Sequence, residues 1–122
     1  LLLRGGQPLA AVGSAGSNRL RSAILMVVAG MVDSGLDPAQ AVARPRVHHE
    51  GGGVDVEGGV PREAIAALRG AGFDLRLWDQ SNLYFGGVSA VGATDHGLRA
   101  AGDPRRGGGA AGVDDRGRVV DL

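Results

Sequence analysis

An apolar segment from Leu20 to Val32, LRSAILMVVAGMV, limits the folds open to this chain more than any other feature. Its apolar residues recur at the spacing of one helical face, on a stripe made of Leu20, Ile24, Val27, Val28 and Met31. Leu25 and Val32 widen this stripe, so we expect a helix that is buried on most of its sides. Gly35 stands where the glycine that follows a helix is usually found.

The segments around this helix predict a layered fold of helices and strands. We expect strands, in apolar or alternating segments, at 9–12, 54–57, 73–78, 86–94 and 98–101. A second helix is expected at 39–43 with Asp37 as its cap. A third begins at Pro61 and ends at Gly70 to Gly72, with its inward face formed by Ala64, Ile65 and Leu68. Residues 44–53 are expected to be loop or extended chain. This order of elements predicts an α+β fold with helices packed on a mostly antiparallel sheet.

Composition describes a soluble globular chain and excludes several classes of function. The 122 residues, 43% of them hydrophobic, fit one domain or part of one. Thirteen basic and thirteen acidic side chains cancel, so no overall field attracts nucleic acid or an anionic membrane. The absence of cysteine excludes disulfides and Cys-ligated metals. The longest apolar stretch, 23–32, is too short to span a bilayer, so we expect no membrane segment in this chain.

A turn bare of large side chains, GSAGSN at 13–18, lies directly before the apolar helix. Ser17 or Asn18 is the expected N-cap. The backbone N–H groups of Ala15, Gly16 and Ser17 can face a negative group there, since the helix dipole adds positive charge at the same place. This arrangement suits a phosphate, a carboxylate or the oxyanion of an acyl-transfer intermediate. A purely structural corner is the alternative, and the pattern itself does not choose.

Two adjacent histidines invite a metal site, but the pattern favours a structural role. His48 and His49 point to opposite sides of an extended chain, and no third ligand stands at a useful spacing. We therefore expect no metal, and a hydrogen-bonded structural pair instead. The enzymatic alternative is a couple between Ser14 and one of these histidines.

The Asp103–Arg106 segment, DPRR, precedes three glycines and also has two interpretations. It is either a turn with solvated arginines or an arginine held by Asp103 so that its planar fork faces a carboxylate.

Taken in order, three segments resemble gamma-glutamyltransferase (gamma-glutamyltranspeptidase). They are GSAGSNR at 13–19, AVARPRVHHE at 41–50 and DPRRGGGAAG at 103–112. The resemblance covers about residues 8 to 113, and the helix order and the spacing between the segments are also similar. Glu50 stands where the family has glutamine, and Ser17 where it has the second glycine of a pair.

The resemblance implies an N-terminal nucleophile hydrolase, whose fold is a four-layer αββα sandwich. Such an enzyme cleaves itself into a large and a small subunit and exposes a Thr nucleophile. That Thr attacks gamma-glutamyl amides such as glutathione, and the acyl-enzyme is released to water or to an acceptor. No dissociable cofactor is implied. Family members are often periplasmic, secreted or membrane-attached, which leaves the compartment of this chain open, the cytoplasm included.

By the same resemblance, the amides of Gly16 and Ser17 supply the oxyanion hole. The Thr nucleophile would lie upstream of residues 1–12, which match no such motif. Residues 1–113 then form the C-terminal portion of a small subunit and 114–122 a polar tail. Since residue 1 is Leu, we expect an expression boundary, a processed subunit or missing upstream sequence.

The implied partner is the upstream polypeptide, or large subunit, of the same enzyme, and this chain by itself is expected to be inactive. Two other functions compete with this one. A non-catalytic truncated relative would self-associate, as a homodimer, to cover an exposed sheet face. A small anion-binding module would use the same turn for a free anion.

Overall fold

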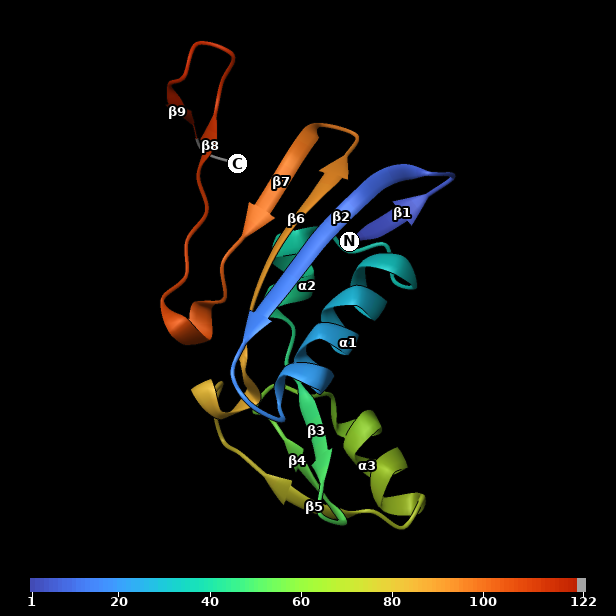
Figure 1. The fold of residues 1–122 in the computed structure, drawn as a ribbon. Coiled ribbons are helices and arrows are strands. Elements are labelled where there is room, and N and C mark those ends of the chain that lie inside the picture. The colour runs from blue at the N-terminus through green and yellow to red at the C-terminus, as the bar shows by residue number, and fades with distance from the viewer. Residues whose placement is uncertain (121–122) are drawn as a thin grey trace.

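A four-stranded antiparallel sheet forms the larger half of the protein in a computed structural model that describes residues 1–120. Its strand order is β1–β2–β6–β7, with bounds Leu2–Arg4, Gln7–Ala15, Gly87–Thr94 and Gly97–Ala101. Two helices, α1 (Leu20–Val32) and α2 (Pro38–Ala43), cover one face of this sheet (Figure 1). The core between helices and sheet consists of Ala23, Val27, Ala41, Val42, Val88 and Ala90.

The buried face of α1 differs from the predicted one. Its fully buried residues are Ala23, Val27 and Gly30, whereas Leu25 is 67% exposed. The expectation of a helix buried on most sides was therefore wrong. Gly30 explains the difference, because a Cβ placed on it would lie 3.4 Å from the Cβ of Ala41. Small residues let α1 approach α2 closely, and larger side chains such as Leu25 lie outside this contact.

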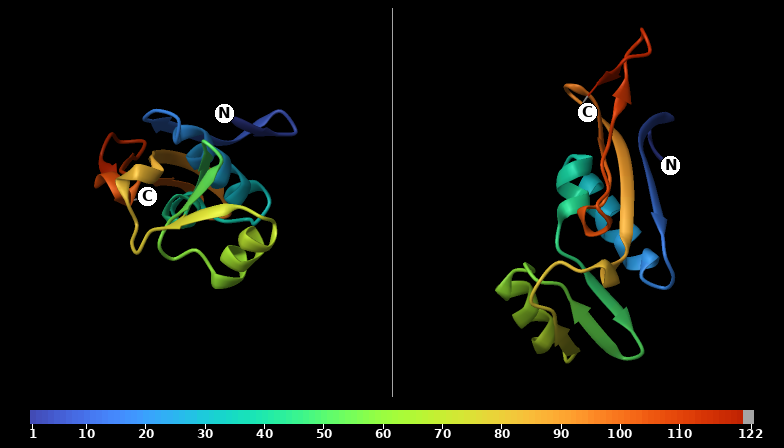
Figure 2. Two further views of the ribbon diagram at one scale, coloured as in Figure 1. Left: turned by 90° about the horizontal axis from the view of Figure 1, so that it is seen from below. Right: turned by 90° about the vertical axis from the view of Figure 1, so that its left-hand side faces the viewer.

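A second sheet of three strands, in the order β3–β4–β5, lies at the end of the larger sheet (Figure 2). The bounds are Val47–Glu50, Gly53–Val56 and Asp74–Leu77. β4 runs antiparallel to β3 and parallel to β5, and α3 (Arg62–Gly70) makes the crossover that a parallel pair requires. β3 thus forms within the segment expected to be loop or extended. No residue of α3 is fully buried, so its predicted inward face is only half-buried at Ile65 and Leu68, and Ala64 is exposed.

Local sequence signals correctly located most of the remaining elements. Asp37 caps α2 in a full capping box with Gln40, with Pro38 at the first helical position. The strands expected at 73–78, 86–94 and 98–101 correspond to β5, β6 and β7. The prediction of an α+β fold with a mostly antiparallel sheet is confirmed. Among helices within residues 1–120, none has the length and apolar character needed to cross a bilayer.

Two short 3₁₀ helices and a hairpin complete the described chain. The 3₁₀ helices are η1 (Leu83–Phe85) and η2 (Pro104–Arg106). The hairpin joins β8 (Gly112–Val113) to β9 (Val119–Val120), so residues 119–120 of the segment expected to be a polar tail pair with the two residues directly before that segment. The last part of that expected tail, 121–122, lies outside the described residues.

Candidate functional site

The bare turn of the sequence is shorter in the structure than its composition predicts. β2 continues through Gly13 and Ser14 to Ala15, which lies opposite Gly87 of β6. The change of direction takes place at Gly16, whose φ of +148° is a backbone conformation that glycine adopts readily. The N-cap of α1 is Arg19, without a side-chain cap, and not Ser17 or Asn18 as predicted. Only 16–19 therefore separate the strand from the helix, and Ala15 belongs to the strand.

Two exposed amides remain at this corner. Among the hydrogen bonds within residues 1–120, none uses the backbone N–H of Gly16 or Ser17 as a donor, while the carbonyl of Ser17 accepts from Leu20 at 3.1 Å. Both residues are exposed and stand directly before the N-terminal end of α1, where the helix dipole is positive. The corner can therefore offer backbone donors to an anion.

Side-chain contacts hold both sides of this corner. Before it, the Ser14 hydroxyl donates to the carbonyl oxygen of Gly87 at 2.6 Å. After it, the amide of Asn18 donates to the carboxylate of Glu50, and the guanidinium of Arg19 lies 4.2 Å from the ring centroid of Tyr84. The backbone amides of Gly16 and Ser17 lie between these held residues. They therefore need to move little when a negative charge develops beside them.

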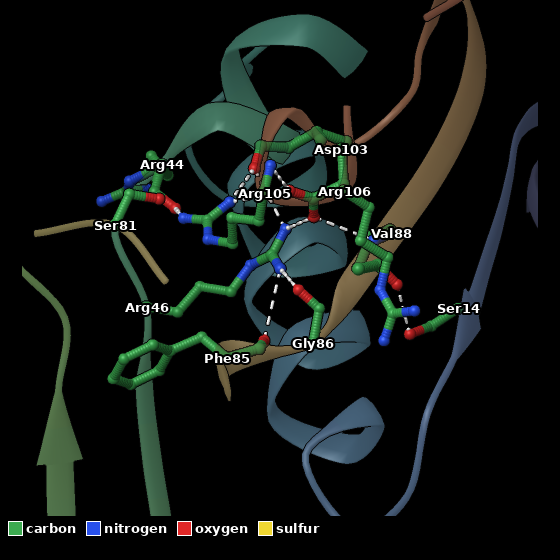
Figure 3. Close-up of polar contacts among 12 residues, drawn as sticks. Ser14, Arg44, Arg46, Ser81, Phe85, Gly86, Val88, Asp103, Arg105 and Arg106 are labelled. Atoms are coloured by element: carbon green, nitrogen blue, oxygen red, sulfur yellow. Dashed lines mark hydrogen bonds and ion pairs between the residues drawn. The ribbon is translucent and has the colours of Figure 1, made fainter. Parts of the chain in front are cut away.

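A buried cluster of four charged side chains lies beside the start of β6 (Figure 3). It consists of Arg46, Glu57, Asp103 and Arg105, each with a side chain at most 2% exposed. Arg105 binds Glu57 with both arms of its fork, at 2.7 Å from Nε and 2.6 Å from Nη2. Arg46 Nη2 donates to Asp103 at 2.7 Å. Two positive and two negative groups balance, which is what allows them to be buried together.

The cluster fixes the start of β6, and through it the corner. Asp103 accepts from the amide of Val88 at 2.9 Å. Arg46 donates to the carbonyls of Phe85, at 3.3 Å, and Gly86, at 2.9 Å. These contacts hold the segment that pairs with Ser14 and Ala15, so the four charges position the strand that leads into the turn.

Both carboxylates of the cluster are held in the charged form. Burial by itself raises the pKa of Glu57, but hydrogen bonds from Arg105 and from the amides of Asn82 and Arg46 outweigh it, and the pKa lies below the usual 4.5. Burial also acts to raise the pKa of Asp103. The amides of Arg105 and Val88 and the Arg46 side chain reverse the effect and lower this pKa below 3.8.

The second interpretation of the DPRR segment agrees with the observed geometry. Asp103 accepts from the backbone amide of Arg105 at 3.0 Å and from its Nη1 at 3.2 Å, which orients the arginine. The carboxylate in front of the fork, however, is Glu57 of this same chain, a partner that the sequence analysis did not identify. The local signal was only the Val-Asp-Val-Glu alternation ending in Glu57, which says nothing about its partner.

The histidines take a structural arrangement. His48 is buried, with Nδ1 2.8 Å from the Ser22 hydroxyl and Nε2 3.4 Å from Glu50, whereas His49 is exposed and lies edge-on to Phe73. This confirms that the two rings point to opposite sides. The couple between Ser14 and a histidine is wrong, because Ser14 is engaged with Gly87 and the hydroxyl beside His48 comes from α1.

An aromatic cluster that the sequence analysis missed supports Arg19. Asp55 accepts hydrogen bonds from Arg76, from Trp78 at 2.9 Å and from the Tyr84 hydroxyl at 2.6 Å. The ring of Trp78 stacks on Tyr84 with centroids 4.7 Å apart. The Arg76 side chain, with Tyr84 and Trp78, holds the pKa of Asp55 far below its ordinary value against the effect of burial. The ring under Arg19 is thereby fixed.

Comparisons with known proteins bear on the family and the fold of this chain. The family model described as gamma-glutamyltranspeptidase matches residues 1–113. No curated protein matches the sequence. Among solved structures, gamma-glutamyltranspeptidase from Pseudomonas nitroreducens is 25% identical with a TM-score of 0.72, and the match covers 93% of this chain and 60% of that one.

Two other solved structures extend the likeness. A mutant gamma-glutamyltranspeptidase from Helicobacter pylori is 23% identical, with a TM-score of 0.71 and coverage of 85% of this chain and 57% of that one. A cephalosporin acylase from Bacillus halodurans is 23% identical, with a TM-score of 0.76 and coverage of 98% and 21%. This chain therefore spans less than two thirds of these relatives. The predicted fold, part of an N-terminal nucleophile hydrolase sandwich, is confirmed.

Proposed function

Because this chain belongs to the gamma-glutamyltranspeptidase family, we propose that it is the C-terminal portion, residues 1–113, of the small subunit of an enzyme that cleaves gamma-glutamyl amides, glutathione among them. The amides of Gly16 and Ser17 form its oxyanion hole. The observation that carries this role is a rigidly held corner with two amides that no other group within residues 1–120 occupies.

The proposed reaction uses a Thr nucleophile that lies outside this chain. Its hydroxyl attacks the gamma-glutamyl carbonyl carbon, and the carbonyl oxygen becomes a tetrahedral oxyanion. The carbon–nitrogen bond then breaks, the amine leaves with the proton that the hydroxyl released, and a glutamyl ester remains. Water or an acceptor amine cleaves this ester. The two amides act on the oxyanion, and donors of this kind are each worth about 3–4 kcal/mol of transition-state stabilisation.

Ser17, where relatives have glycine, is compatible with this role. The donor is the backbone N–H, so the side chain need only stay clear of the anion, and Ser17 is exposed. The positive φ at this corner, +148°, belongs to the neighbouring Gly16, and within residues 1–120 no residue other than glycine, Ser17 included, has a positive φ.

The free face of the larger sheet supports the proposed upstream partner. Ala11 and Gly13 on β2, with Ser89 and Val91 on β6, point away from the helices and are exposed. In an αββα sandwich a second sheet covers such a face, and we propose that the upstream polypeptide supplies it. This chain by itself would then be inactive.

The same face favours a second candidate function, self-association. Exposed small and apolar residues together with the free edge of β7 are a surface on which a second copy could pack. Light scattering of the isolated chain distinguishes self-association from the role of an enzyme subunit. A stable homodimer that does not bind the upstream polypeptide supports a non-catalytic relative. A free-anion module using Gly16 is the third candidate, for which phosphate would raise the melting temperature.

The test is co-expression of this chain with its upstream polypeptide and an assay on a gamma-glutamyl anilide. Turnover is expected in the complex and not in the isolated chain. Ser17→Ala keeps the backbone donor and should keep activity, whereas Ser17→Pro removes it and should lower kcat by about 100-fold or more. A folded complex without turnover, or equal activity of the two variants, would contradict the proposal.

A further inference from the structure

Arg106 approaches the proposed oxyanion corner from η2. Its Nη2 donates to the carbonyl oxygen of Ala15 at 3.3 Å. The same Nη2 lies 3.8 Å from the position that a Cβ on Gly16 would take. Figure 3 shows its guanidinium beside Ser14 of β2, whereas Arg105 points toward the buried cluster.

Two features of the fold keep Arg106 in this place. Its backbone amide donates to the carbonyl of Asp103 at 3.0 Å, which ties it to the buried cluster. Its aliphatic part crosses Gly87 so closely that a Cβ on Gly87 would overlap Cδ and lie 2.5 Å from Nε. Because Gly87 has no side chain, the Arg106 side chain can pass over it toward Ala15.

The contact matters because the carbonyl of Ala15 and the N–H of Gly16 belong to one peptide group. A positive donor on that carbonyl draws electron density from the amide and makes its N–H a stronger donor, as in any chain of hydrogen bonds. It also restrains the orientation of the peptide plane. Within residues 1–120 no carboxylate forms an ion pair with Arg106, so its charge is not neutralised by a close partner.

We propose that Arg106 is a positioning residue that orients and polarises the Ala15–Gly16 peptide for the oxyanion. The proposal rests on the proposed function of the corner and deepens it. Arg106 binds no substrate in this role. It acts on the transition state through Gly16 and leaves binding of the ground state unchanged.

The test compares Arg106→Met, Arg106→Lys and the control Arg99→Met in the co-expressed complex. Arg99 is an exposed arginine of β7 on the same sheet, so the control makes the same change of charge and shape elsewhere. Arg106→Met is expected to lower kcat roughly twofold to eightfold with KM unchanged, since each bond in a chain strengthens its neighbour by about 10–30%. Arg106→Lys should recover part of the loss, because one ammonium donor still reaches the carbonyl.

A second measurement separates this role from general damage. A boronic acid analogue of the glutamyl group forms a tetrahedral anion on the nucleophile, whereas free glutamate binds without one. Arg106→Met should weaken the boronate by the same factor as kcat and leave glutamate affinity unchanged. Equal loss of both affinities, or a kcat equal to that of Arg99→Met, would overturn the inference. If the wild-type complex has no turnover, the proposed function fails first, and the two failures are therefore distinguishable.

Discussion

Replacing Asp103 by Asn should destabilise the fold strongly, because this carboxylate is the meeting point of the buried charges. Its Oδ2 accepts from Arg46 at 2.7 Å and from the amide of Val88 at 2.9 Å. Its Oδ1 accepts from Arg105, at 3.0 Å from the backbone and 3.2 Å from Nη1. Asparagine keeps the shape but has one oxygen, so its NH₂ group must face donors on one side.

The magnitude follows from charge and burial. Without Asp103, two buried arginines share only Glu57, and a net positive charge is left in a site whose side chains are at most 2% exposed. Breaking a buried pair in this way costs about 3–5 kcal/mol. Since ordinary domains are stable by about 5–15 kcal/mol, the variant should lose a large part of its stability.

Urea denaturation measures the loss, and Asp114→Asn is the matched control. Asp114 also accepts several hydrogen bonds, from the amides of Arg116 and Arg118 at 2.9 Å each and from Arg118 Nε at 2.8 Å, but in an exposed hairpin. The control should therefore lose much less. If the two variants unfold at the same urea concentration, burial of the cluster does not govern its energetics, and the reasoning is refuted.

Two further predictions concern pH and packing. Glu57 and Asp103 have folded pKa values below their ordinary 4.5 and 3.8, so the unfolded chain binds more protons as the pH falls. Their contribution is complete above about pH 5 and is lost as the pH falls toward the folded pKa values. Urea midpoints measured from about pH 7 down to pH 3 should therefore decline below about pH 5, and a flat profile would contradict this. Gly58→Ala places a Cβ 2.5 Å from the carbonyl oxygen of Asp79 and 2.6 Å from the amide nitrogen of Gln80, both backbone atoms that cannot swing away. We expect Gly58→Ala to lower the free energy of unfolding by about 1–3 kcal/mol. Gly53→Ala should have only a small effect, because the nearest atom to its Cβ is 3.9 Å away. Equal thermal midpoints of the two variants would contradict this prediction.

Much of the fold could be predicted from the sequence, because it depends on interactions between residues that are close together in the chain. Asp37 and Pro38 define the start of α2 because a cap and a fixed φ act within one turn of chain. The alternating residues of β5 and β6 specify strands because each side chain responds to the face on which it lies. The sequence also located the corner at Gly16, because a run of small residues directly before an apolar helix was enough to predict exposed backbone amides there.

Tertiary structure decided what sequence periodicity leaves open. Periodicity shows which side chains share a face of α1, but not that Gly30 and Ala23 would be buried in preference to Leu25, because close approach of helices selects the smallest residues. The partner of Arg105 is Glu57, 48 positions away, and that of Arg46 is Asp103, 57 positions away. Pairing over such separations depends on how the strands and helices pack. The sequence by itself therefore determined the family, the α-helices, the longer strands and the candidate corner. Only packing decided which charges are buried together and which arginine reaches Ala15, because burial and charge pairing are properties of the assembled fold and not of any short segment.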